Sequence, residues 1–68
     1  MTQIERINKY LDDFGSITSF EAFIDLGIVK LSNRISEMIQ MGEKINKTPI
    51  YKTNRYGEKV RLVRYTRA

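Results

Sequence analysis

The chain contains no cysteine and no histidine, and this excludes several kinds of chemistry. Without cysteine there is no disulfide and no thiolate nucleophile, and nothing indicates an oxidising compartment. Without histidine there is no imidazole base and no ordinary metal cluster. Carboxylates are few, and no glycine-rich phosphate loop is present. The sequence therefore predicts a protein that is not an enzyme and that needs no metal or cofactor.

Long apolar runs are also missing from the sequence. No segment approaches the roughly 20 apolar residues that a membrane-spanning helix needs. The first residues have neither the basic region nor the apolar run of a signal peptide. A cytoplasmic protein without a membrane partner is therefore expected. With 68 residues, the chain is expected to form one domain over 1–68, which buries only about 60% of the surface that its unfolded form exposes.

The charge that is present is divided unevenly along the chain. Residues 1–42 carry four basic and six acidic side chains, a net charge of −2. Residues 43–68 carry eight basic and two acidic side chains, a net charge of +6. The basic character thus belongs almost wholly to the last third of the chain. Such asymmetry favours a polyanionic partner for that segment, with nucleic acid first and a membrane surface second.

Capping signals and glycines predict three helices within residues 1–42. Thr2 and Thr18 each precede a glutamate three residues later, which is the capping-box pattern at a helix N-terminus. Gly15, Gly27 and Gly42 each follow a segment with apolar residues at helical spacing, and glycine commonly ends a helix. The helices are expected near 3–14, 19–26 and 30–41. The predicted core consists of Ile7, Leu11, Phe14, Phe20, Phe23, Leu31, Ile35 and Met38.

The third predicted helix has an outer face of small, amide and charged side chains. Advancing 100° per residue places Asn33, Ser36 and Gln40 opposite the apolar arc centred on Ile35, with Arg34 at its border. Amide side chains can bond adenine edges, and serines can bond phosphates or bases. An ordinary solvated face is the other interpretation of this pattern. We favour contact with a DNA groove, since solvated faces are usually richer in glutamate and lysine.

The basic segment, residues 43–68, is predicted to form a β-hairpin. One strand runs from about Lys44 to Thr53 and is interrupted by Pro49, which suits an edge strand or a bulge. The turn lies at 54–58, and the second strand alternates apolar and basic residues over 59–66. Such a hairpin can lie along phosphates or enter a minor groove. The alternative is a hairpin whose charges protect an edge from aggregation.

This order of elements resembles a winged helix-turn-helix domain, and in particular the small helix-turn-helix proteins encoded by bacteriophages. The segment S-I-T-S-F-E-A-F-I-D-L-G-I-V-K-L-S-N-R-I-S-E-M carries the resemblance. It continues where the third helix leads into the hairpin. The matching positions in this segment, in the passage from the third helix into the hairpin and in the hairpin itself are Ala22, Leu26, Gly27, Leu31, Arg34, Ile35, Met38, Gly42, Ile45, Gly57 and Tyr65. The resemblance implies an α+β fold of three helices (1–42) followed by a two-stranded wing (43–68).

The function that the resemblance implies is binding of double-stranded DNA by a small transcriptional regulator or recombination accessory factor, acting in the host cytoplasm if it is phage-encoded. The third helix would read the major groove, and the wing would contact the backbone or the minor groove. The expected contact residues are Thr18, Ser19, Lys30, Ser32, Asn33, Arg34, Ser36, Lys52, Arg55, Tyr56, Lys59 and Arg61.

A second reading of the same fold stays open at the level of sequence. The domain could bind a host protein, as a phage-encoded inhibitor of a nucleic-acid enzyme, with its basic wing on an acidic surface. Glu37 on the supposed groove face favours this reading, because a carboxylate near phosphates is unfavourable unless it accepts a bond from cytosine. A homodimer also remains open.

Overall fold

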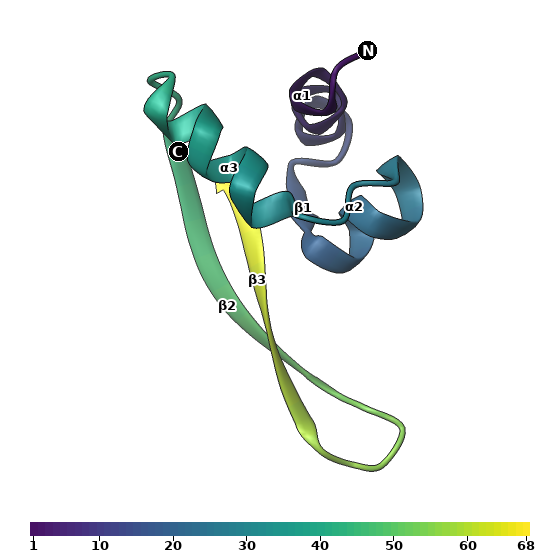
Figure 1. Ribbon diagram of the computed structural model, residues 1–68. Helices are drawn as coiled ribbons and strands as arrows, with labels where there is room; N and C mark the ends of the chain where they lie inside the picture. The colour runs from purple at the N-terminus through teal and green to yellow at the C-terminus, as the bar shows by residue number, and fades with distance from the viewer.

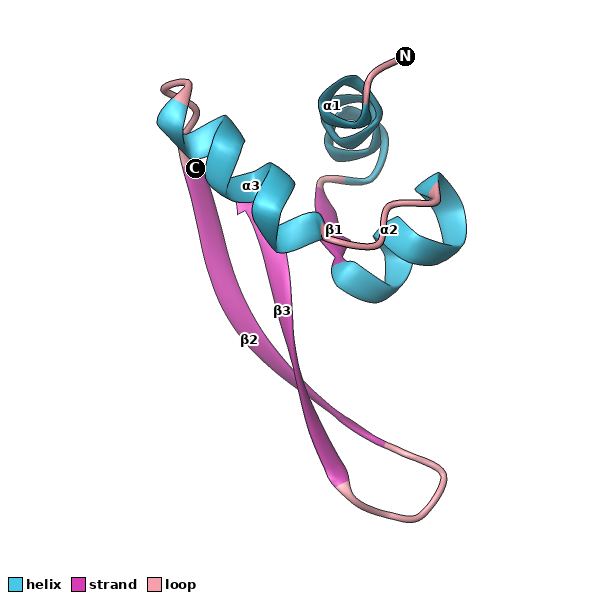
Figure 2. Ribbon diagram, in the orientation of Figure 1, coloured by secondary structure: helices cyan, strands magenta, loops and turns pink.

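The computed structural model describes all 68 residues and shows three helices and one three-stranded antiparallel sheet. Helix α1 spans Gln3–Phe14, α2 spans Ser19–Leu26 and α3 spans Leu31–Gln40. Strand β1 spans Ser16–Thr18, β2 spans Ile45–Thr53 and β3 spans Lys59–Arg67. The helices gather at one end, and the β2–β3 hairpin extends away from them (Figures 1 and 2). No helix is both long and apolar enough to span a membrane.

The predicted helix boundaries are confirmed to within one residue, because the capping signals are local. Both capping boxes are formed: Thr2 with Glu5 and Thr18 with Glu21, each with the two reciprocal hydrogen bonds. The carboxylate of Glu5 accepts the backbone N–H of Thr2, which lowers its pKa. Gly15 and Gly27 end α1 and α2 with φ angles of 81° and 69°, a conformation that other residues rarely adopt.

The expectation of a two-stranded wing is wrong, because β1 adds a third strand to the sheet. The strand order is β1-β3-β2, and β1 pairs with the end of β3 through three residues, with Ile17 opposite Tyr65. Ile17 and Thr18 are buried between α1 and α2, and buried backbone groups need hydrogen-bond partners. The sheet therefore joins the hairpin to the helices.

The hairpin register is continuous from Ile45 opposite Arg67 to Thr53 opposite Lys59. No bulge is present at Pro49, which lies in an edge strand, or at Leu62 and Val63. Leu62 and Val63 are both half-buried and lie on opposite faces of the sheet. The turn at 54–58 is confirmed. Residues two apart along each strand thus share one face, and this divides the basic side chains into two groups.

The core confirms the predicted places of Ile7, Leu11, Leu31, Ile35 and Met38, which are all buried. It also contains residues that the sequence did not single out as core. These are Tyr10, Ile17, Ala22, Ile28 and Tyr65.

The places predicted for the three phenylalanines are wrong, since Phe14, Phe20 and Phe23 are 69%, 65% and 56% exposed. Helix α2 turns Ala22 inward instead, and its small side chain lets the helix approach the core closely. Tyr10 takes the place in the core expected for Phe14, and the Phe14 ring packs on it with centroids 4.6 Å apart. Bulky rings at 20 and 23 therefore point away from the core.

Candidate nucleic-acid interface

Helix α3 presents a polar face that the protein itself leaves free. Leu31, Ile35 and Met38 are at most 1% exposed and fix the inward side of the helix. The outward side carries Ser32, Asn33, Ser36 and Gln40, and these side chains are exposed and make no hydrogen bond within the protein. Lys30 is the exposed N-cap residue of the helix. The donors and acceptors of this face are therefore available to base edges.

Arg34 and Glu37 form an ion pair at the edge of that face. Their nearest nitrogen and oxygen are 3.2 Å apart, and the side chains are 33% and 46% exposed. The Nε atom of Arg34 is buried without a hydrogen-bond partner. Because Glu37 is paired, it places less uncompensated negative charge on the face than the sequence alone suggested.

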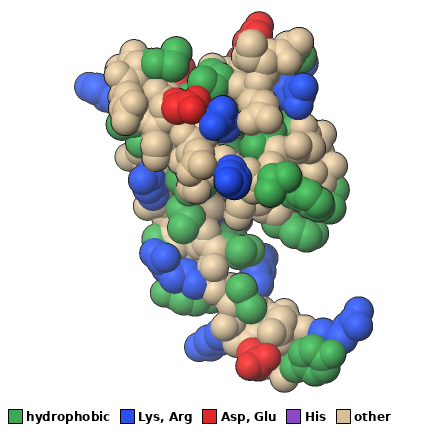
Figure 3. All heavy atoms as spheres, in the orientation of Figure 1, with side chains coloured by type: hydrophobic (Ala, Val, Ile, Leu, Met, Phe, Trp, Pro, Cys, Tyr) green, Lys and Arg blue, Asp and Glu red, His purple; other side chains and the backbone are tan.

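The hairpin supplies most of the basic charge and leaves it uncompensated. Of the eight basic residues after position 42, only Arg67 is in an ion pair, with Asp12 of α1. Arg67 also donates to the backbone and side-chain oxygens of Asn8, so it holds β3 to α1. Blue side chains are spread along the hairpin in Figure 3, and red ones are rare there. Seven basic residues thus remain free to meet phosphates.

The register divides the predicted wing residues between two faces. Arg61 lies opposite Tyr51, and Lys59 lies opposite Thr53, so these four residues share one face with Ile17 and Tyr65. Lys52 lies opposite Val60 on the other face. The structure therefore brings Lys59 and Arg61 together and separates Lys52 from them.

Two further residues on the Arg61 face were not among the contact residues predicted from the sequence. Lys47 is exposed opposite Tyr65, and Tyr51 is 63% exposed opposite Arg61. On the other face, Arg64 lies opposite Thr48 and was missed as well. The alternation along each strand could have grouped Lys47 with Tyr51, but only the register relates them to Arg61.

The tip of the hairpin is held in one shape by Asn54. Its side-chain oxygen accepts the backbone N–H groups of Tyr56 and Glu58 at 2.9 and 3.0 Å, and its amide nitrogen donates to the Glu58 carboxylate. Backbone hydrogen bonds from Asn54 to Glu58 and from Gly57 to Asn54 close the turn. Arg55 and Tyr56 project from this turn, and Tyr56 is 81% exposed. A fixed turn loses little conformational freedom when its side chains bind.

The N-terminus of α2 offers less than the sequence predicted. The backbone N–H of Thr18 donates to Glu21, and the Thr18 hydroxyl accepts from the backbone of Glu21. Thr18 is also only 6% exposed. The Thr18 N–H is thus already bonded within the capping box, and contact of Thr18 with a phosphate stays a prediction. Ser19 is exposed and remains available.

A groove of about 610 Å³ separates the start of α2 from the hairpin. Phe20, Ile50, Val60 and Leu62 provide its apolar lining, and Lys52 and Arg64 add positive charge. The groove thus places apolar surface beside basic side chains of the hairpin.

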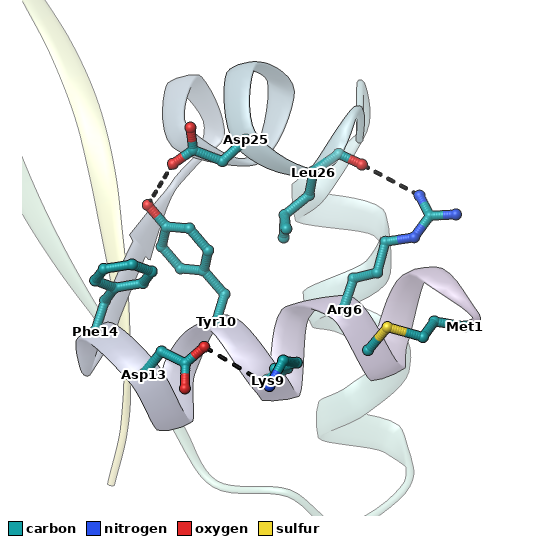
Figure 4. Close-up of a pocket in the computed structure, with 8 residues that line it drawn as sticks. All are labelled: Met1, Arg6, Lys9, Tyr10, Asp13, Phe14, Asp25 and Leu26. Carbon is teal, nitrogen blue, oxygen red and sulfur yellow. Dashed lines mark hydrogen bonds and ion pairs between the residues drawn. The ribbon is translucent and has the colours of Figure 1, made fainter.

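A second hollow, of about 420 Å³, lies between α1 and α2 and is drawn in Figure 4. Its polar groups are bonded to one another: Tyr10 donates to Asp25 at 2.7 Å, and Arg6 donates to the backbone oxygen of Leu26 at 3.1 Å. The bond to Asp25, with desolvation and the nearby Glu21 charge, raises the pKa of Tyr10 to about 12. These bonds fasten α2 to α1, so this hollow is part of the scaffold.

Comparison with protein families gives one match. The model of a family described as a winged helix-turn-helix domain matches residues 2–66. It covers all three helices, all three strands and the turn of the hairpin except the last residue of β3. Comparison with curated proteins and with solved structures gives no match.

Proposed function

The chain belongs to the winged helix-turn-helix domain family, and from this we propose that it binds double-stranded DNA as a small regulator of transcription or an accessory factor of recombination. Helix α3 would enter the major groove, and the β2–β3 hairpin would contact the backbone or the minor groove. The role is one of binding, without catalysis. If the protein is phage-encoded, it acts in the cytoplasm of the host cell.

The observation that carries this proposal is the joint placement of two free surfaces. The outer face of α3 carries serine and amide side chains with no partner in the protein, and the hairpin carries seven unpaired basic residues. The hairpin extends away from the helices, so its tip can reach beyond the part of a duplex that α3 would occupy (Figure 1). Phosphate contacts would position the domain, and α3 would read sequence.

Glu37 no longer favours a protein partner over DNA as strongly as it did in the sequence. Its carboxylate lies 3.2 Å from Arg34, so the pair brings little net charge to the face. Inhibition of a host nucleic-acid enzyme by the same fold remains the alternative, and the experiment below separates it from DNA binding.

A salt titration against random duplex DNA tests the proposal. We expect binding at low ionic strength, because phosphate contacts are independent of sequence. If six or more of the free basic residues meet phosphates, affinity falls by roughly 10³-fold or more between about 50 and 200 mM salt. Absence of binding to any duplex at low salt, or binding that salt does not change, would contradict DNA binding and leave the protein-partner alternative.

A further inference from the structure

Strand β3 has an edge over residues 59–63 that no other strand covers. Its pairing with β1 ends at Arg64, opposite Thr18, whereas its pairing with β2 continues as far as Lys59. In Figure 2 the hairpin continues well past the short strand β1 toward its tip. We call residues 59–63 of β3, on the side away from β2, the open edge. An uncovered edge is a template on which another strand can pair.

The register shows which backbone groups face the open edge. One step beyond each end of the β2–β3 ladder, Asn54 donates to the backbone oxygen of Glu58 and Ala68 donates to that of Lys44. These bonds join directly opposite residues, and in an antiparallel pair such bonded positions recur at every second residue. The even-numbered residues of β3 therefore turn their backbone N–H and C=O groups toward β2. The odd-numbered residues turn theirs away from β2.

The open edge combines free backbone groups with a basic face and an apolar face. Lys59 and Arg61 are odd-numbered, so their backbone groups point where no strand lies, and their side chains are in no ion pair. Val60 and Leu62 lie on the other face of the sheet. There they line, together with Phe20, the groove of about 610 Å³. Alternate residues of the edge thus offer positive charge and apolar surface.

We propose that the open edge binds an extended segment of a partner protein in which apolar and acidic residues alternate. The segment pairs with residues 59–63 as an added strand, in the line that β1 would follow if it continued. Its apolar side chains lie opposite Val60 and Leu62 and enter the groove, and its carboxylates lie opposite Lys59 and Arg61. In this mode of recognition the backbone bonds supply affinity and the alternate side chains supply specificity.

The charge at the edge favours a different protein over a second copy of this chain. Two copies that paired through their open edges would bring Lys59 and Arg61 against the same basic residues, and like charges opposite one another are destabilising. The outer edge of β2 fits no better, because it carries Lys47 and Pro49, and proline has no N–H to pair. An acidic segment meets the edge with complementary charge.

Occupation of the open edge also bears on the binding of DNA. Lys59 and Arg61 are among the residues expected to meet phosphates, so a segment that covers them competes with a duplex for the hairpin. This consequence rests on the proposed function, whereas binding of the segment itself does not. The partner would thus act as an antagonist of DNA binding.

Amide hydrogen exchange followed by NMR measures pairing at the open edge. In the free protein, the N–H of Arg61 should exchange faster than that of Leu62, which is bonded to β2. The probe is a six-residue peptide with blocked ends in which valine and glutamate alternate. At about 1 mM peptide, a complex of millimolar affinity is half formed. We then expect exchange at Arg61 to slow about two-fold, with little change at Leu62.

Two control peptides separate strand pairing from other kinds of binding. The first has serine in place of valine and keeps the charge. The second keeps both kinds of side chain and is methylated on every backbone nitrogen, so it has no N–H donors. Both should protect Arg61 less than the valine–glutamate peptide does. Absence of protection by the valine–glutamate peptide, or equal protection by either control, would overturn the proposal.

A variant of the apolar face gives a second readout. Val60 is 40% exposed, and Val60→Ser removes apolar surface from the groove while the backbone pairing with β2 is retained. We expect its affinity for the valine–glutamate peptide to fall roughly 3- to 10-fold. Val29→Ser changes a valine that is 73% exposed between α2 and α3, and this matched control should bind the peptide like the wild type. Equal affinities of the two variants would contradict contact with the groove.

Competition with duplex DNA at low salt separates this inference from the proposed function. The valine–glutamate peptide should reduce binding of random duplex DNA, and the serine–glutamate peptide of the same charge should reduce it less. If no duplex binds at all, DNA binding is contradicted and amide exchange still decides the open edge. If the peptide protects Arg61 while duplex binding is unchanged, the competition is contradicted and both kinds of binding stand.

Discussion

The guanidinium of Arg34 lies 3.2 Å from the carboxylate of Glu37 on α3, one turn along the helix. The pair holds both side chains at the border between the buried side of the helix and its free polar face. Glu37 thus offsets the charge of the one arginine on α3, so this helix attracts phosphates less than it otherwise would. If α3 enters a groove, discrimination among sequences then depends on its serine and amide side chains.

Removing the Glu37 charge should strengthen non-specific binding. In Glu37→Gln, Arg34 is free to meet a phosphate and a negative charge near the duplex is lost. Because the pair is partly exposed, we expect only about a 2- to 5-fold gain in affinity for random duplex DNA at low salt. Asp13→Asn, which removes an exposed carboxylate of α1, is the control and should gain less. A loss of affinity in Glu37→Gln would mean that Glu37 contacts the DNA favourably.

Asn33 is the side chain on which we expect sequence preference to depend most. It is exposed near the start of α3, where recognition helices contact bases, and it has no partner in the protein. Losing one bidentate contact costs roughly 1–3 kcal/mol of discrimination. Asn33→Ala should therefore lose preference at one or two base pairs in a selection from random sequences and keep its affinity for random DNA. Recovery of the same motif by wild type and variant would rule out this role.

The hairpin should contribute affinity without sequence preference. Arg55→Ala and Arg61→Ala each remove one unpaired cation from the wing, and each should reduce the log–log salt slope by about one. The loss should be similar for all duplex sequences. Lys9→Ala on α1 is the control and should leave the slope unchanged. Equal slopes for wild type and both hairpin variants would show that the wing does not touch phosphates.

Ile35 should carry a large share of the stability of so small a domain. Its side chain is fully buried among the helices, so Ile35→Ala leaves a cavity and should lower the free energy of unfolding by roughly 2–4 kcal/mol. Ile39→Ala removes similar atoms from a residue that is 40% exposed and should cost much less. Urea denaturation of the two variants measures the difference. Comparable losses would show that the inward side of α3 is misassigned.

Tyr10 should make stability fall at high pH. Its pKa is raised to about 12 in the folded protein from 10.0, so the unfolded chain releases this proton first as pH rises. The stabilising bond to Asp25 is therefore fully present below pH about 10 and is lost as pH rises through about 12. Tyr10→Phe should lower the free energy of unfolding by roughly 1–2 kcal/mol at neutral pH.

Urea denaturation of Tyr10→Phe and of the wild type, measured from neutral pH to about pH 11, tests this coupling. The range ends below the extreme alkaline pH that would itself unfold the protein. The difference in unfolding free energy should shrink as pH rises above about 10. All other side chains are the same in both proteins, so their contributions cancel in this comparison. A difference that stays constant with pH would show that Tyr10 and Asp25 are not coupled.

The local features of the chain could be predicted from sequence because their causes lie within four residues of one another. The Thr2 and Thr18 capping boxes, the glycine stops at 15 and 27, and the turn at 54–58 all depend on neighbouring residues. The inward sides of α1 and α3 were also predictable, since both helices have ten or more residues and one clear apolar side. The excess positive charge after residue 42 is a property of sequence alone.

Only the tertiary structure decided which side of α2 faces the core. This helix has eight residues, and its apolar side chains point in nearly every direction, so periodicity cannot choose among them. Ala22 faces the core because its small side chain lets the helix pack closely. The hydrogen bond between Tyr10 and Asp25 fixes the rotation of α2 about its axis. That orientation left Phe20 and Phe23 exposed.

The strand pairing of the sheet also depends on contacts between residues that lie far apart in the chain. The pairing of Ile17 with Tyr65 joins residues that are distant in the chain, and no local pattern signals it. The hairpin register, which groups Arg61 with Lys59 and separates both from Lys52, is set by pairing across the turn. The sequence by itself thus determined the helix ends, the turn and the basic hairpin. Packing between distant residues determined which of their side chains are free to bind.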